Sequence, residues 1–345
     1  MRVIDTENIM DAMRNETQFV LRCEEVFHDK CSAACGSILS ALPQKRIVAL
    51  TGPSGSGKTT TAEMLKHAFA AIGKHLHTIS IDDFYYDRDV LAARSRARGG
   101  EIDYDSPETV DIPLFAAVVR EITSAPMASV PRFSFREGRR TGMRQIACTP
   151  SDAFLFEGIQ AVYPELTRYL AGSPYEALFI SVESAVDVGG VVFEPREVRF
   201  LRRLVRDYKF RGSDAEFTLK LWPNVRRGEK LYISPYKENA DLKFDSSLAT
   251  EVCVMKPYVV PLLQELPRGQ YPDADAILAA YDRIEALDES LIPADSLIRE
   301  FIGGGSFSCC GRLHAHVFVV RADSAGGAAG HGQHEHGGKD PDQDF

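Results

Sequence analysis

The chain has 345 residues, enough for two average domains or for one large domain with additions. Its 44% hydrophobic and 26% charged residues exclude a collagen-like, coiled-coil or wholly disordered protein. The net charge of −9 has the wrong sign for a protein that binds nucleic acid mainly through phosphates. No run approaches the roughly 20 apolar residues that cross a bilayer, and the start lacks signal-peptide order. We expect a globular cytoplasmic protein that acts on a small molecule, without a nucleic-acid or membrane partner.

An N-terminal segment precedes the first strand pattern. Apolar residues recur at helical spacing over residues 1–45, and Pro43 ends the pattern. This predicts a helical accessory segment. His28, Cys31 and Cys35 within it could contribute to a metal site, but no second ligand pair at matching spacing accompanies them. Plain buried or surface thiols are the favoured interpretation.

The next region alternates short apolar runs with amphipathic segments. Apolar runs predict strands at 47–50, 78–81, 153–156 and 177–182. Helical spacing predicts helices at 60–72, 107–122 and 194–209. Such alternation is typical of an α/β fold in which a parallel sheet carries helices on both faces.

The C-terminal third is expected to be mainly helical and then to lose its structure. After residue 213 the helical pattern runs through Leu231, a segment at 240–248 follows, and further helical patterns lie at 251–266, 274–287 and 296–301. From Gly303 on, glycine, alanine and histidine dominate, which predicts a solvated tail, although its histidines could bind a metal. The expected parts are an N-terminal segment (1–45), a central domain (46–248), a helical extension (249–303) and a disordered tail (304–345).

A glycine-rich loop follows the first predicted strand. Residues 52–59 read Gly-Pro-Ser-Gly-Ser-Gly-Lys-Thr and fit the P-loop pattern G-x-x-x-x-G-K-[ST]. The glycines let backbone N–H groups surround phosphate oxygens, Lys58 reaches the β- and γ-phosphates, and the Thr59 hydroxyl binds Mg²⁺. The pattern therefore predicts binding of ATP with Mg²⁺. The expected ATP-binding residues are Gly52, Ser54, Gly55, Ser56, Gly57, Lys58, Thr59 and Thr60.

Two carboxylate positions follow predicted strands at the sheet edge where α/β proteins bind ligands. Glu157 ends the run 153–156 and could hold Mg²⁺ through water. Asp82 and Asp83 end the run 78–81 and could accept a proton from an attacking hydroxyl. The alternative for each is a capping or solvated acid.

An arginine-rich helix is predicted near residues 199–213. Arg199, Arg202, Arg203 and Arg206 are three to four residues apart and share one helix face, with apolar residues on the other. Arginines brought in by a closing lid stabilise the charge that spreads over a transferred phosphoryl group. A solvated basic face is the alternative.

Taken together, these motifs resemble the uridine kinase and phosphoribulokinase family of P-loop kinases. The resemblance covers about residues 46 to 248 and rests on residues 52–60, 80–85, 103–108, 156–159 and 206–212. Residues 221–229 and 297–304 look closer to a bacterial subgroup whose kinase is often fused to threonyl-tRNA-synthetase-like domains. Before residue 46 this sequence has the helical segment instead.

The resemblance implies a role for each matching residue. Asp82 would be the general base, Asp105 would bind ribose hydroxyls, and Arg206 and Arg211 would contact the ATP phosphates. The acceptor-side residues implied by the same motifs are Tyr85, Asp105, Phe133, Phe135, Arg140 and Arg203. Family members are often oligomeric, so a homo-oligomer is expected.

Two departures from the family pattern lie on the acceptor side. Gly138 stands where pyrimidine nucleoside kinases have a base-reading histidine, and Ser213 stands where they continue Arg-Gly-Arg. A buried polar contact to a base supplies much of the discrimination between substrates. The expected activity is phosphorylation of a nucleoside 5′-hydroxyl, foremost of uridine or cytidine. The alternatives are a kinase of another small hydroxyl metabolite, such as a sugar phosphate, and an ATP-binding regulatory protein.

Overall fold

The computed structural model describes residues 2–4, 15–41, 44–97 and 102–306. All of them belong to one compact unit, Met1–His314. The predicted tail, apart from residues 304–306, lies outside the described residues, as do residues 5–14 of the N-terminal segment.

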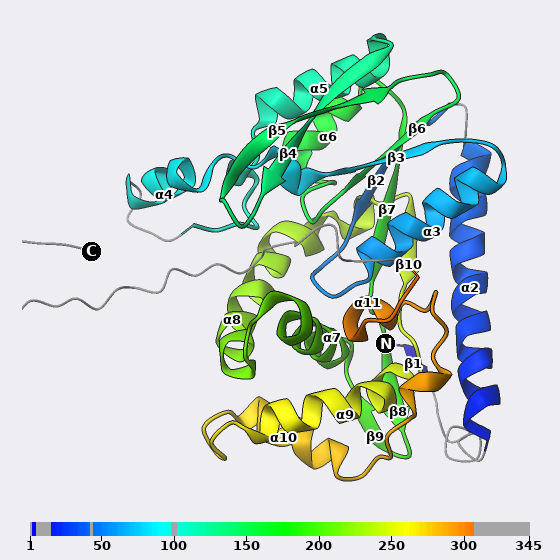
Figure 1. Ribbon diagram of the computed structural model, residues 1–345, viewed down its shortest axis with the longest axis vertical. Coiled ribbons are helices and arrows are strands. Elements are labelled where there is room, and N and C mark those ends of the chain that lie inside the picture. Colours follow the sequence, from blue (N-terminus) through cyan, green and yellow to red (C-terminus); the bar gives the residue numbers. More distant parts are fainter. Residues whose placement is uncertain (1, 5–14, 42–43, 98–101, 307–345) are drawn as a thin grey trace, which may run out of the picture. The chain divides into compact units, whose positions relative to one another are not determined.

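A five-stranded parallel sheet forms the centre, in the order β10-β7-β2-β6-β3 (Figure 1). Its strands are β2 (Ile47–Thr51), β3 (Leu76–Ser80), β6 (Ala153–Glu157), β7 (Tyr175–Ser181) and β10 (Leu242–Asp245). The first four were predicted from short apolar runs, which are typical of strands that bury side chains on both faces. The strand β10, at the edge of the sheet beside β7, was not predicted as a strand.

Helices cover both faces of this sheet, as predicted. Val48 and Leu50 of β2 join one core, and the intervening Ile47 and Ala49 join another. The first core includes α2 (Glu16–Ala41), α3 (Lys58–Ala71), α7 (Pro195–Arg211), α9 (Glu251–Gln264) and α10 (Pro272–Tyr281). The second includes α5 (Ile112–Ser124) and α6 (Pro164–Leu170). The remaining helices are α4 (Arg88–Ala97), α8 (Ala215–Gly228) and α11 (Arg299–Ile302).

Local capping explains where the central helices begin and end. The Asp111 carboxylate accepts the Leu114 N–H at the start of α5. Helix α7 starts with a capping box between Glu194 and Glu197, and it ends at Gly212, whose φ of 65° suits glycine. Asp214 then caps α8 by accepting the Phe217 N–H. The turn between α7 and α8 is therefore encoded by adjacent residues.

Two small sheets were not expected from the sequence. The hairpin of β4 (Met127–Ser134) and β5 (Arg139–Ala147) is antiparallel and has an irregularity at Arg132/Phe133. In the other sheet, β1 (Arg2–Ile4) pairs with β8 (Ser184–Val188), which also pairs with β9 (Val191–Phe193). The prediction of a wholly helical N-terminal segment is therefore wrong at β1. A strand of three residues is too short to show a period of its own, and its partner supplies the hydrogen bonds.

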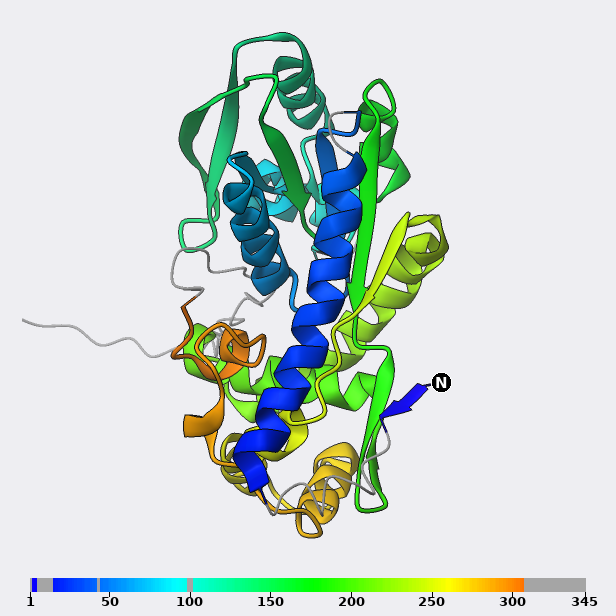
Figure 2. The same cartoon turned by 90° about the vertical axis from the view of Figure 1, so that its right-hand side faces the viewer.

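The helical additions before and after the central domain pack against it. Figure 2 shows α2 running alongside the sheet, and α2 contacts α3, β10 and the 3-10 helix η6 (Glu289–Leu291). Cys31 and Cys35 are buried in this packing. In the C-terminal extension, α9 packs on α7 and α10, and α11 also packs on α7. No helix in the described part of the chain has the length and apolarity to cross a membrane.

Candidate active site

The P-loop joins β2 to α3 at the C-terminal edge of the sheet. Gly55 and Gly57 have φ values of 76° and 92°, a region that favours glycine. A Cβ at Gly52 would overlap the Ile180 carbonyl oxygen, and one at Gly57 would overlap the Leu297 side chain. The loop glycines are therefore required both by backbone geometry and by the elements packed around them.

The residues of this loop fit a nucleotide phosphate. The Ser56 hydroxyl is buried, and the described ranges of the chain offer it no hydrogen-bond partner. Lys58 Nζ folds back to donate to the carbonyl oxygens of Gly52 (2.7 Å) and Pro53 (3.1 Å). Burial lowers the pKa of Lys58 to about 8, and the charges of Glu157 and Glu300 oppose that shift. A half-buried ammonium that donates to carbonyl dipoles is suited to receive an anion.

Mg²⁺ also has suitable ligands here. Thr59 is half-buried in the first turn of α3. Glu157 is buried at the end of β6, where it is in register with Leu50 of β2 and Ser80 of β3. Mg²⁺ takes one or two carboxylates together with hydroxyl, water and phosphate oxygens. Thr59 and Glu157 would hold it beside the phosphates.

Three arginines of α7 meet around one carboxylate. Asp207 lies 3.2 Å from Arg203 Nε, 2.7 Å from Arg206 Nη2 and 3.3 Å from Arg211 Nη1. The three guanidinium groups hold the pKa of Asp207 below its usual value, despite burial that acts in the opposite direction. Burial lowers the pKa of Arg203 to about 10 and that of Arg211 to about 9. Three cations on one anion leave excess positive charge, which favours a bound phosphate.

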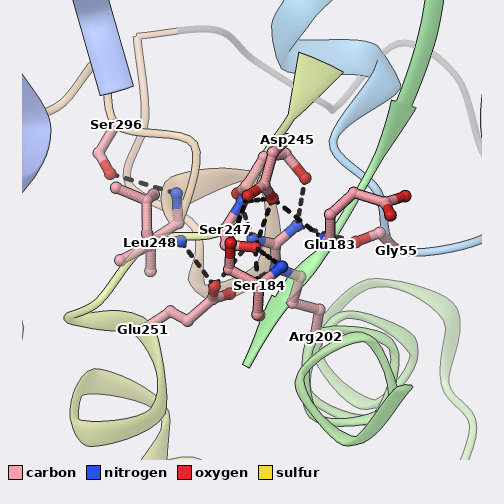
Figure 3. A network of polar contacts seen from close by, with 11 residues as sticks. Gly55, Glu183, Ser184, Arg202, Asp245, Ser247, Leu248, Glu251 and Ser296 are labelled. Carbon is pink, nitrogen blue, oxygen red and sulfur yellow. Dashed lines mark hydrogen bonds and ion pairs between the residues drawn. The ribbon is translucent and has the colours of Figure 1, made fainter. Parts of the chain in front are cut away.

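Arg199 and Arg202, from the same predicted face, are engaged in buried ion pairs. Arg199 Nη2 donates to both carboxylate oxygens of Glu229, at 2.9 and 2.7 Å. Arg202 pairs with Glu251, and its Nη1 donates to the Gly55 carbonyl oxygen at 3.0 Å (Figure 3). The alternative of a solvated basic face is wrong, because Arg199, Arg202 and Arg203 are all buried. The elements α8, α9 and α11 cover the helix from several sides.

Arg202 and Glu251 belong to a larger polar network that fastens the P-loop to the edge of the sheet. Arg202 also donates to the Ser246 carbonyl and hydroxyl oxygens, and Leu248 N–H donates to Glu251. Figure 3 shows these groups converging below β10. On the neighbouring turn, Asp245 accepts from the Ser184 hydroxyl at 2.6 Å. A satisfied buried network of this kind fixes one geometry for the loop.

Asp82 lies where β3 ends, in the 3-10 helix η2 (Ile81–Phe84). It is 5% exposed, and its charge acts on Lys58, Asp105, Tyr85 and Arg211. The neighbouring Asp83 takes a structural position, because its carboxylate accepts the Phe133 N–H of β4 at 3.1 Å. Of the two adjacent aspartates, Asp82 is therefore the one whose charge acts both on the P-loop lysine and on the predicted acceptor-side residues.

An aromatic cluster borders Asp82. The rings of Phe133 and Phe135 lie 6.1 and 6.2 Å from the ring of Tyr85, in edge-to-face geometry. Tyr85 is buried, and its hydroxyl donates to the Tyr104 carbonyl and accepts from Gln160 Nε2 at 2.8 Å. The structure thus brings together the three rings that the sequence motifs assign to the acceptor side. Gln160, which follows the Phe-Glu-Gly-Ile motif, was not singled out from the sequence.

Asp105 is enclosed by a segment that sequence reasoning did not assign to the site. A Cβ at Gly228, the last residue of α8, would overlap the Asp105 carboxylate. In the following π-helical turn η4 (Glu229–Ile233), the Tyr232 hydroxyl donates to Asp103 at 3.1 Å. Burial raises the pKa of Asp105 to about 7, helped by Asp103 and opposed by Arg203. In the sequence, this contact between Gly228 and Asp105 is indicated by nothing more than the glycine in Arg-Arg-Gly-Glu (residues 226–229).

Two other acceptor-side positions are occupied by protein contacts. Arg140, predicted to bind the acceptor, donates from Nη2 to the Asp111 carboxylate at 2.6 Å. Gly138 has a φ of 68° at the β4–β5 turn, and its carbonyl accepts the Arg88 N–H at 2.7 Å. A side chain at Gly138 would meet that of Arg88. A histidine at position 138 would therefore need a left-handed backbone conformation and a shift of the Arg88 side chain.

The C-terminal extension also reaches the P-loop helix. Glu300 accepts hydrogen bonds from both the N–H and the hydroxyl of Thr60. Ser296 of the same extension donates to Glu24 of α2 at 2.7 Å. No sequence motif indicated these contacts, because residues 60 and 300 meet only through tertiary folding.

Comparison with known proteins places the chain in a family. Residues 47–252, more than half of the chain, match the family described as PRK: Phosphoribulokinase / Uridine kinase family. The chain belongs to this family. Its members are ATP-dependent phosphotransferases with a hydroxyl acceptor, and so is this enzyme.

Curated relatives match over the same region. A uridine kinase of Lactobacillus helveticus is 27% identical over 208 residues, which cover 59% of this chain and 88% of the relative. A uridine kinase of Staphylococcus epidermidis is 29% identical over 217 residues, which cover 61% and 92%. A solved structure described as a possible uridine kinase from Bacillus stearothermophilus has 17% sequence identity and a TM-score of 0.42, and the match covers 63% of this chain and 98% of that one.

Proposed function

We propose that the enzyme transfers the γ-phosphoryl group of ATP to the 5′-hydroxyl of a nucleoside, foremost uridine or cytidine. The observation that carries the proposal is the position of Asp82, which acts electrostatically on Lys58 of the P-loop and also on Tyr85 and Asp105 on the acceptor side. A carboxylate in such a position can accept the proton of an acceptor hydroxyl that attacks the γ-phosphate. The curated relatives named above are uridine kinases, which supports this acceptor class.

In the proposed mechanism, the protein positions and neutralises the reacting groups. Asp82 accepts the proton of the acceptor hydroxyl, and Asp105 hydrogen-bonds the ribose. Lys58 turns from its carbonyl partners to the β- and γ-phosphates, where Arg206 and Arg211 offset the charge of the transferred group. Mg²⁺ held by Thr59 and Glu157 would supply further charge neutralisation when bound. Closure of α7 as a lid, which would exclude water, stays a prediction.

The proposal is tested by measuring ADP release from Mg·ATP with a panel of nucleosides and sugar phosphates and with a control lacking an acceptor. Stimulation by uridine or cytidine is the expected result. Stimulation only by another acceptor would keep the mechanism and replace the substrate. That alternative is favoured by one observation, the Arg88 side chain that lies against Gly138 where the family has its histidine.

The substitution Asp82→Asn separates a kinase from an ATP-binding regulator. General-base catalysis contributes about 10²–10⁴-fold, so turnover should fall by that factor while Mg·ATP binding is kept. Asp83→Asn is the matched control. It makes the same change at the adjacent aspartate, whose carboxylate accepts the Phe133 N–H. Turnover that survives Asp82→Asn unchanged would contradict the proposed mechanism.

A further inference from the structure

A carboxylate from outside the family-matched region lies on the P-loop helix. Glu300 Oε2 accepts the Thr60 N–H at 3.0 Å and the Thr60 hydroxyl at 2.7 Å. Thr60 is the third residue of α3, so its N–H is one of the four donors that a helix cannot satisfy internally. Gly57, the residue before the helix, has no side chain to cap it. Glu300 thus supplies the anion that this helix end lacks.

The segment that carries Glu300 is firmly built into the fold. Leu297 and Phe301 on either side of it are fully buried, and Leu297 packs on Gly57. The Arg202 guanidinium lies 5.2 Å from the centre of the Phe301 ring. Ser296 is tied to Glu24 by a buried hydrogen bond. Glu300 is itself 8% exposed, so its contact with Thr60 is a feature of the packed structure.

A phosphate and this carboxylate compete for the same position. The P-loop pattern directs the first N–H groups of the following helix to phosphate oxygens. The Thr60 N–H cannot donate fully to two anions, and two anions at one buried site repel each other. Hydrogen bonds to a charged carboxylate are stronger than those to a neutral group, so the displacement of Glu300 lowers the affinity for ATP by a measurable factor.

We propose that Glu300 is a nucleotide-site residue that holds Thr60 in the empty enzyme and is displaced by an ATP phosphate. The C-terminal extension thereby sets the affinity for ATP. This inference rests on the part of the proposed function that places ATP at the P-loop, and it does not depend on the acceptor. The competing explanation is that Glu300 only caps α3 and keeps its place when ATP is bound.

The test is calorimetric titration of the full chain with Mg·ATP, without an acceptor, for the wild type, Glu300→Gln and Glu285→Gln. Glu285 is an exposed glutamate of the same extension and is the matched control. We expect Glu300→Gln to bind Mg·ATP about tenfold more tightly, because a neutral amide is easier to displace. We also expect its empty form to unfold at a lower temperature, because α3 loses its anionic cap. Glu285→Gln should match the wild type in both measurements.

Two results would overturn the proposal. A lower unfolding temperature with unchanged or weaker ATP binding in Glu300→Gln would show a cap only. Absence of Mg·ATP binding in both the wild type and Glu300→Gln would remove the P-loop premise as well. The nucleoside proposal can fail without affecting this test. In that case nucleosides would not stimulate ADP release, while Glu300→Gln would still bind Mg·ATP more tightly than the wild type.

Discussion

Gly228 lies against Asp105 so closely that any side chain at position 228 would overlap the Asp105 carboxylate. Glu229, the next residue, pairs with Arg199, whose Nη1 donates to the Ser54 carbonyl of the P-loop at 3.4 Å. Two adjacent residues at the end of α8 therefore contact Asp105, which we propose to bind the acceptor, and Arg199, which contacts the P-loop. This arrangement makes the end of α8 a wall of the site.

The first prediction concerns this wall. Gly228→Ala should raise the KM for the acceptor at least tenfold while leaving Mg·ATP affinity within about twofold, because Asp105 must move away from the new methyl group. Steady-state kinetics with varied acceptor, together with ATP titration, measure both quantities. Gly172→Ala is the control, since a Cβ there meets no neighbouring atom. An unchanged acceptor KM in Gly228→Ala would remove Asp105 from the acceptor site.

Asp105 should make stability depend on pH. Its pKa is about 7 in the folded protein, against an ordinary aspartate value of 3.8 in the unfolded chain. Between these values the folded state keeps a proton that the unfolded state has lost, so this group's contribution to stability falls as pH rises from about 4 to 7. The Asp105→Asn variant has no carboxyl group at this position, so its stability does not fall with pH for this reason. Its free energy of unfolding, measured by urea denaturation relative to the wild type, should increase by on the order of 2 kcal/mol from pH 5 to pH 8.

The matched control for that experiment is Asp273→Asn, at an exposed position in the first turn of α10. Its stability difference from the wild type should vary little with pH. A difference for Asp105→Asn that is equally flat would contradict the raised pKa.

Lys58 should make ATP binding depend on pH. Its pKa in the empty enzyme is about 8, and bound phosphates would raise that pKa because they favour the ammonium form. The affinity for Mg·ATP should be constant from pH 7 to just below 8 and then weaken by up to tenfold per pH unit. Lys58→Arg should bind ATP with no such decline, since a guanidinium keeps its charge. Isothermal titration at several pH values checks both, and a wild-type affinity unchanged up to pH 9.5 would refute the prediction.

The buried Arg202–Glu251 pair should be important for folding. Both side chains are fully buried, and Arg202 also holds the Gly55 carbonyl. Glu251→Gln leaves a buried guanidinium without its anion and should cost about 3–5 kcal/mol of unfolding free energy. Glu265→Gln, at the exposed end of the same helix, should cost less than about 0.5 kcal/mol. Chemical denaturation of the two variants measures the difference, and equal stability would contradict this account of the network.

Local sequence was enough to predict the central fold and the P-loop. The strands β2, β3, β6 and β7 each contribute apolar residues to both cores, so each forms a short apolar run that can be recognised from its own residues. The P-loop pattern is read within eight residues, because its chemistry uses the backbone of one turn and the helix that follows. The place of Asp82, directly after a predicted strand and therefore at the ligand-binding edge of the sheet, could also be predicted from local sequence.

Only the tertiary structure decided which charged groups face one another. The helical spacing placed Arg199 and Arg202 on the same helix face as the arginines predicted to bind phosphate. In the structure they pair with Glu229 and Glu251, which lie 30 and 49 residues further along the chain. Glu300 meets Thr60 across 240 residues. Helical spacing gives the face on which a side chain lies and says nothing about what that face packs against. Which residue occupies the Thr60 donors is set by the folding of the C-terminal extension onto the loop.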